Sequence, residues 1–107
     1  MKRSLFAVMF AISVAGLAFA AGDAAAGKAA YDKACKSCHG TDGTPNAAIA
    51  KSMKVEMKHL GSAEVQATSD DDLKKAITAG HGKMKPVKSV SAKAADDIVA
   101  YVRTLKQ

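Results

Sequence analysis

The sequence predicts a small all-α domain of about four short helices. Two observations favour this fold class: apolar residues recur at helical spacing towards the C-terminal end, and no stretch alternates apolar and polar residues as a half-buried strand would. With 107 residues, the chain has the length of a single domain, which is typically about 100 to 150 residues. A multidomain enzyme is therefore excluded.

The first twenty residues predict an export signal rather than a part of the fold. Two basic residues precede an uncharged apolar run from Leu5 to Phe19, and Ala18–Ala20 has the small residues that signal peptidase requires. We expect cleavage after Ala20, a periplasmic mature domain over residues 21–107, and no stable membrane insertion after cleavage. The alternative is an uncleaved anchor, because the uncharged stretch is long enough to span a bilayer of about 30 Å.

The mature chain has little apolar material for a core of its own. Residues 21–107 contain three Leu, three Ile, six Val and no Phe, so these four types make up 12 of 87 residues. A charged chain with less than about 20% of these residues buries too little surface to offset its conformational entropy. Either the mature protein is unfolded or a non-protein group supplies apolar bulk.

The first half of the mature chain predicts two helical segments. The Ala-rich stretch 22–34, with Asp23 as its N-cap, is expected to run as a helix into the cysteines. Residues 46–58 follow turn residues and predict a short helix. Met53 and Met57 lie at helical spacing within it and are interpreted as core filler.

The second half predicts two further helices. Three acids at 70–72 follow Ser69 and suit the positive end of a helix dipole, so a short helix is expected there that ends at Gly80. A last helix is expected to open at Ser91, because four apolar residues then fall at i, i+3, i+4 and i+7: Ile98, Tyr101, Val102 and Leu105. Residues 61–69 are interpreted as a polar connection.

One motif carries recognisable chemistry. Cys35-Lys36-Ser37-Cys38-His39 is a C-x-x-C-H run, the attachment signature of a c-type haem. The two thiols, three positions apart near the end of a helix, project to the same side, and each can add across one vinyl group of the porphyrin. His39 is expected to ligate the iron through Nε2 while Nδ1–H donates to a backbone carbonyl. The porphyrin would supply the missing apolar surface.

Three other interpretations of the cysteines compete with haem. A structural zinc site would use Cys35, Cys38, His59 and His81, although the histidines are 22 residues apart instead of the usual three to five. A thioredoxin-like redox pair needs a strand before the motif, where this chain is Ala-rich. A disulfide across so short a loop stabilises little and leaves His39 unexplained. Outside the zinc hypothesis, His59 is interpreted as a surface or structural residue.

The second axial ligand is expected from the segment His81-Gly82-Lys83-Met84-Lys85-Pro86. Gly82 and Pro86 flank Met84 with turn residues, so a loop can carry its thioether against the iron. Met84 is therefore the preferred ligand. His81 is the rival, and ligation by two histidines would give a lower reduction potential.

The chain resembles the class I (monohaem, c-type) cytochromes c of the small bacterial periplasmic type. The resemblance covers almost the whole mature chain and rests on three motifs: Gly27-Lys28-x-x-Tyr31-x-x-x-Cys35-x-x-Cys38-His39-Gly40, Gly82-Lys83-Met84-x-Pro86, and Ile98-x-x-Tyr101. It implies the small cytochrome c fold, with about four short helices packed around one covalently attached haem.

The family pattern also implies particular contacts. The first and last helices should cross nearly at right angles, with Gly27 and Tyr31 meeting Ile98 and Tyr101. A proline carbonyl should accept the Nδ1–H of the haem histidine, and Pro45, six residues after His39, is the sole candidate. Residues 47–67 match no family motif.

What the resemblance implies about function is one-electron transfer without enzymatic turnover. Cys35 and Cys38 would hold one haem c, and His39 and Met84 would ligate its iron. The protein would shuttle electrons, as a monomer, between periplasmic or membrane redox partners. The alternative function is a haem-based ligand-binding or sensing protein with a weak or open sixth position.

Charge adds an expectation about partners. The chain has 16 Lys and Arg against 10 Asp and Glu, a formal net charge of +6. Five lysines near the ligand segments are interpreted as a docking surface for an acidic donor or acceptor, or else as a solvated basic face: Lys33, Lys36, Lys83, Lys85 and Lys88. Nucleic acid is not an expected partner, because the basic residues are scattered among acids and no recognition motif is present.

Overall fold

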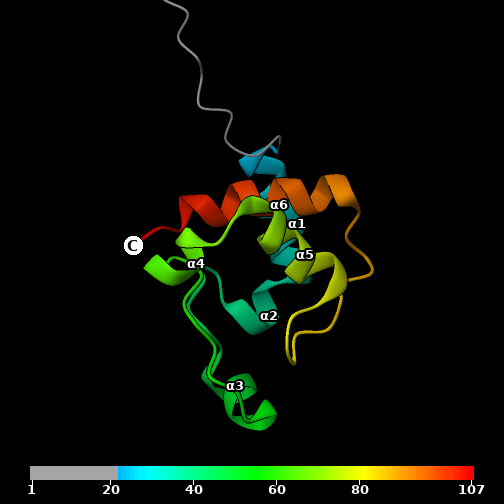
Figure 1. Cartoon of the computed structure of the whole chain (residues 1–107). Coiled ribbons are helices and arrows are strands. Elements are labelled where there is room, and N and C mark those ends of the chain that lie inside the picture. Colours follow the sequence, from blue (N-terminus) through cyan, green and yellow to red (C-terminus); the bar gives the residue numbers. More distant parts are fainter. Residues whose placement is uncertain (1–21) are drawn as a thin grey trace, which may run out of the picture.

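The computed structural model describes residues 22–107, and the predicted signal segment lies outside this range. The described residues form six helices and no strand, as the predicted fold class requires (Figure 1). The elements are α1 (Ala24–Ala34), α2 (Lys36–His39), α3 (Ala47–Met53), α4 (Ala63–Ala67), α5 (Asp70–Ala79) and α6 (Ala92–Thr104).

The three longest helices begin where their N-caps predicted. Asp23 accepts the backbone N–H groups of Ala25 and Ala26 at the start of α1. Ser69 and Ser91 do the same for one N–H each in α5 and α6. These oxygens satisfy donors that a helix otherwise leaves unpaired, so local sequence fixes the three starting points.

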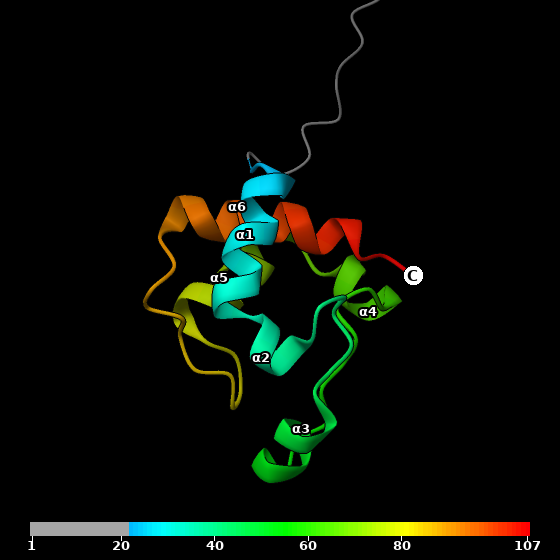
Figure 2. The same ribbon diagram turned by 180° about the vertical axis from the view of Figure 1, so that it is seen from behind.

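Helices α1 and α6 cross in close contact, with α6 along the upper edge of the helical body (Figures 1 and 2). Gly27 makes the crossing possible, because a Cβ there would lie 1.9 Å from the backbone oxygen of Asp97. The expected approach of the two helices at Gly27 is therefore present, with α6 backbone as the partner. Tyr31 and Ile98 are both fully buried beside it.

The hydrophobic core lies on one side of the molecule. Its buried members come from α1, α5, α6 and the residue that follows α1, whereas α2, α3 and α4 contain no buried residue. The core is small, as the composition predicted: Tyr31, Cys35, Ile77, Ala95, Ile98, Val99, Tyr101 and Val102.

One expectation for the middle of the chain is wrong and another is confirmed. Residues 61–69 are not only a polar connection, because they contain α4, which Ser62 caps by accepting the N–H of Val65. A helix of five residues is too short to produce a periodic pattern of apolar residues. The short helix predicted within 46–58 is present as α3, which ends at Met53, where Lys54 adopts a left-handed conformation with φ 55°.

Candidate haem site

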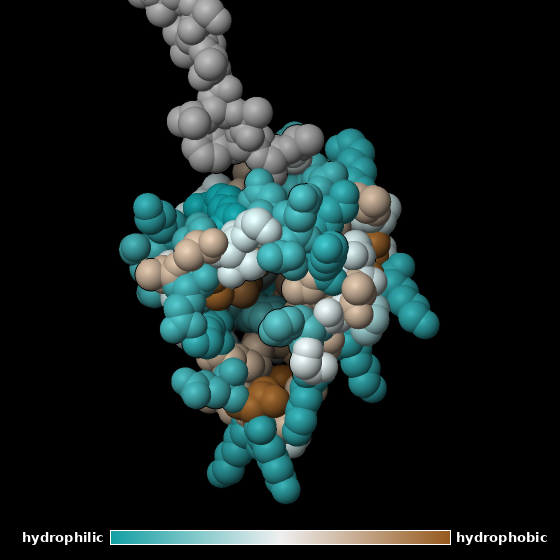
Figure 3. Space-filling model, in the orientation of Figure 1, coloured by the Kyte–Doolittle hydropathy of each residue, from teal (hydrophilic) through white to brown (hydrophobic). Residues whose placement is uncertain are grey.

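A cleft of about 1080 Å³ separates α2 and α3 from α5 and the loop that follows it. Apolar atoms lie exposed at this hollow and over α3, with hydrophilic side chains around them (Figure 3). Part of the lining comes from the segment 47–67, for which the sequence offered no function: Ile49, Met53, Val55, Met57, Leu60 and Val65. Met53 and Met57 therefore line a cleft and are not core filler, which corrects their predicted role.

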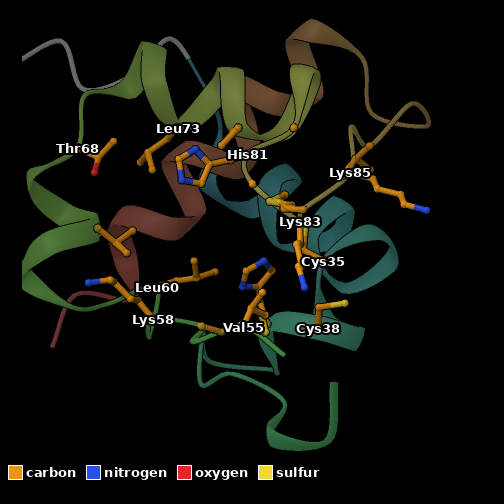
Figure 4. Close-up of a pocket in the computed structure, with 18 of the residues that line it drawn as sticks. Cys35, Cys38, Val55, Lys58, Leu60, Thr68, Leu73, His81, Lys83 and Lys85 are labelled. Carbon is orange, nitrogen blue, oxygen red and sulfur yellow. The ribbon is translucent and has the colours of Figure 1, made fainter. Parts of the chain in front are cut away.

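The cysteines lie at one end of this cleft, where α1 gives way to α2. Cys35 follows α1 and is buried, whereas Cys38, on the single turn of α2, is partly exposed. Both line the cleft as free thiols (Figure 4). Burial, and secondarily the charge of Cys38, raises the pKa of Cys35 to about 11. A thioredoxin-like pair needs a strand before the motif, and helix α1 precedes the cysteines instead, so that interpretation loses its support.

His39 lies on the same turn and also lines the cleft. Burial lowers the pKa of its imidazole, which favours the neutral form that a metal ligand needs. Within residues 22–107 its Nδ1 is buried without a hydrogen-bond partner, so the expected bond to the Pro45 carbonyl is absent. The chain after Pro45 is fixed to α2 instead, because Asn46 donates to the carbonyls of Ser37 and Cys38.

On the opposite side of the cleft, His81 and Met84 form a tight pair. Each donates its backbone N–H to the carbonyl of the other, at 2.9 Å in both cases. Gly80 and Gly82 both have positive φ, and a Cβ on Gly80 would lie 2.7 Å from the Met84 oxygen. The turn predicted around Met84 is present, although the reciprocal pairing with His81 was not foreseen.

The two candidate ligands, Met84 and His81, differ in how deeply their side chains are buried. Met84 is partly buried and lines both the cleft and a smaller apolar cavity behind it, which Cys35 and His39 also line. His81 is exposed and lines the outer cleft, into which its ring points (Figure 4). Residues directly opposite each other in such a bridge project to the same side, which explains why both face the cleft.

The zinc arrangement does not form. Among the residues that the structure describes, no group of three or more His, Cys, Asp or Glu side chains could hold a metal ion. Nδ1 of His59 accepts the N–H of Gly61 at 2.8 Å, which fits the structural role expected for this residue.

The residues present fit a covalently attached porphyrin. The cleft offers two free thiols at C-x-x-C spacing, an imidazole whose pKa is lowered by burial, and a thioether from the facing loop. A cavity of this size lies at the upper end of those that hold small ligands and cofactors, roughly 300 to 1,000 Å³. The fold and the site thus define an all-helical haem protein.

Comparison with known proteins supports the same class. Residues 22–102 match the family model described as Cytochrome C oxidase, cbb3-type, subunit III. The chain also resembles a solved structure, the KustC0563 c-type cytochrome, with 31% sequence identity and a TM-score of 0.65, over 76% of this chain and 98% of that one. A search of curated proteins gave no match. The chain belongs to the monohaem c-type cytochrome family and carries a covalently bound c-type haem.

The family is one of haem-based electron-transfer proteins. Among the helices of residues 22–107, the longest has 13 residues, and none combines the length and apolarity needed to cross a bilayer.

Proposed function

We propose that the protein is a one-electron carrier whose haem is tethered by Cys35 and Cys38 and whose iron is ligated by His39 and Met84. One observation carries the proposal: these four side chains come from two distant segments and line a single cleft. When bound, the haem iron supplies the one-electron couple. With His39 and Met84 both holding the iron, no open ligand position would remain for a substrate.

The deeper burial of its side chain supports Met84 over His81 as the sixth ligand. Met84 borders the inner cavity together with His39, whereas His81 is exposed at the outer cleft. A thioether ligand favours the reduced metal and raises the potential, which suits a carrier that accepts electrons readily.

The sixth ligand is tested by the visible spectrum of the oxidised protein. We expect the sulfur-to-iron charge-transfer band in the wild type and in His81→Ala, and its loss in Met84→Ala. Loss of low-spin character in His81→Ala, with Met84→Ala unchanged, would instead assign the ligand to His81. Rapid binding of carbon monoxide to the reduced wild type would favour the ligand-binding alternative.

We also propose that partners approach the cleft through an acidic surface. The five lysines predicted as a docking surface are all exposed. Oxidation of the reduced protein by ferricyanide, an anion, should slow as salt rises, and oxidation by the cation tris(1,10-phenanthroline)cobalt(III) should accelerate. If the oxidation rates with both reagents do not change with ionic strength, electrostatic steering is rejected.

The proposed site of action is the periplasm, with residues 1–20 removed on export. The basic start, the apolar run and the motif at Ala18–Ala20 support this. N-terminal sequencing of the haem-loaded protein should begin at Ala21, and a sequence that begins at Met1 would favour the uncleaved anchor.

A further inference from the structure

A segment that we call the α3 lobe, residues 46–60, extends away from the helical body (Figures 1 and 2). Within residues 22–107, substantial helix contacts join α6 to α1 and α5, and α1 to α2, and none involves α3. Hydrogen bonds fix the base of the lobe, where Leu60 donates to Gly43 and Asn46 donates to Cys38. Packing between helices therefore does not hold the far end.

Lys83 supplies a bond at that far end. Its Nζ donates to the backbone carbonyl of Met53 at 2.7 Å. Met53 is the last residue of α3, and the final carbonyls of a helix lack intrahelical partners. An ammonium group is also favourable at the negative end of a helix dipole. Lys83 thus satisfies a group that the left-handed turn at Lys54 leaves open.

This bond crosses the mouth of the haem cleft. Lys83 belongs to the loop that carries Met84, and Met53 belongs to the lobe, and both residues line the cleft. The lobe also contributes Val55 and Met57 to the same wall. Breaking the bond would release the lobe. The loop would keep its place, because the His81–Met84 pair holds its own turn.

We propose that Lys83 is a positioning residue that latches the α3 lobe over the cleft and limits the access of small molecules to the haem. The inference rests on the proposed haem site, but it does not depend on which residue is the sixth ligand. Lys85 is a matched control, because it carries the same charge and also borders the cleft. The end of its side chain, however, points away from the cleft (Figure 4).

Hydrogen exchange of the haem-loaded protein tests the latch. The reporters are the amides of Lys54 and Val55, which donate to carbonyls of α3. In Lys83→Gln these amides should exchange about three to ten times faster, because loss of a charge-assisted hydrogen bond favours local opening. Lys85→Gln should leave them unchanged, and Lys83→Arg, which keeps a cationic donor, should restore most of the protection.

Binding of imidazole to the oxidised protein tests the barrier itself. Entry should accelerate by a similar factor in Lys83→Gln and not in Lys85→Gln. Three results would overturn the latch. The amides of Lys83→Gln could exchange at the wild-type rate, or imidazole could enter Lys83→Gln and Lys85→Gln equally fast. Alternatively, the amides of Lys83→Gln could exchange faster while imidazole enters at the wild-type rate. The charge-transfer band of the same samples reports separately on Met84, so a failure of the proposed ligation is distinguishable from a failure of the latch.

Discussion

Tyr31 and Tyr101 stand edge to face, with ring centroids 5.0 Å apart and ring planes inclined at 63°. The Tyr31 hydroxyl donates to the carbonyls of His39 and Gly40, and the Tyr101 hydroxyl donates to that of Thr41. Burial raises the pKa of Tyr31, so its hydroxyl keeps its proton at neutral pH. The two rings therefore connect the crossing of α1 and α6 to the backbone around His39, the proposed haem ligand.

The hydroxyl of Tyr31 should matter more than that of Tyr101. Tyr31→Phe removes bonds of 2.7 and 3.1 Å at a fully buried residue, whereas Tyr101→Phe removes one of 3.3 Å. We expect losses in the free energy of unfolding of about 1 to 3 kcal/mol and under about 1 kcal/mol respectively. Urea unfolding of the haem-loaded proteins measures both, and a larger loss for Tyr101→Phe would contradict the assignment.

Gly27→Ala should destabilise the protein. On helix propensity alone, this change within α1 would stabilise it by about 1 kcal/mol. The new Cβ, however, would meet the backbone oxygen of Asp97 at 1.9 Å, and the two helices must move apart. Overpacking of this kind costs about 1 to 3 kcal/mol. Thermal unfolding gives the sign directly, and a higher melting temperature would show that the crossing tolerates a methyl group.

Much of the fold was predictable because its causes are local. The caps Asp23, Ser69 and Ser91 and the apolar stripe of α6 act within one helix, and the three longest helices follow from them. Helix α4 was missed because distant residues support it. Gln66 donates to Val102, 36 positions away, and Arg103 donates to the carbonyls of Gln66 and Thr68.

The candidate site was likewise predictable only in part. Spacing and turn residues identified Cys35, Cys38, His39 and Met84, and the structure gathers these four around one cleft. The wall built by the α3 lobe was missed, because the helical spacing of Met53 and Met57 indicated a core face, whereas the chain leaves the helix at Lys54 and both residues line the cleft. The Pro45 contact was wrong for a similar reason, since the bonds of Asn46 to α2 decide where that turn lies.

Acidification should remove a stabilising contact at Asp97. The backbone N–H of Asp23, and then Lys93, lower the pKa of this carboxyl, although burial opposes the shift. A depressed folded-state pKa gives stability that is present above the unfolded value, about 3.9, and lost as pH falls through the folded one.

Asp97→Asn should therefore destabilise the protein at pH 7, with the difference from wild type shrinking below about pH 4. Denaturant midpoints at several pH values measure the effect, with Glu56→Gln, an exposed side chain outside the helices, as the control. A difference that stays constant down to pH 2 would mean that Asp97 acts through packing and not through its charge.

Removal of both thiols should abolish covalent attachment and most of the fold. In Cys35→Ala/Cys38→Ala, the intact mass should equal that of the bare polypeptide, and acid extraction should release any pigment. Since the core consists of eight buried residues on one side of the molecule, we expect little helix by circular dichroism. A colourless but well-folded double variant would contradict the dependence of folding on haem.

The principal helix contact joins α1 to α6, the two ends of the described chain. Closing this contact means ordering a loop of roughly 60 residues, so folding cannot complete from local pieces. During synthesis, α1 would emerge from the ribosome well before its partner α6. For the export proposed above, this delay would keep the precursor unfolded while it crosses the membrane. Both thiols would then be accessible when the haem is attached.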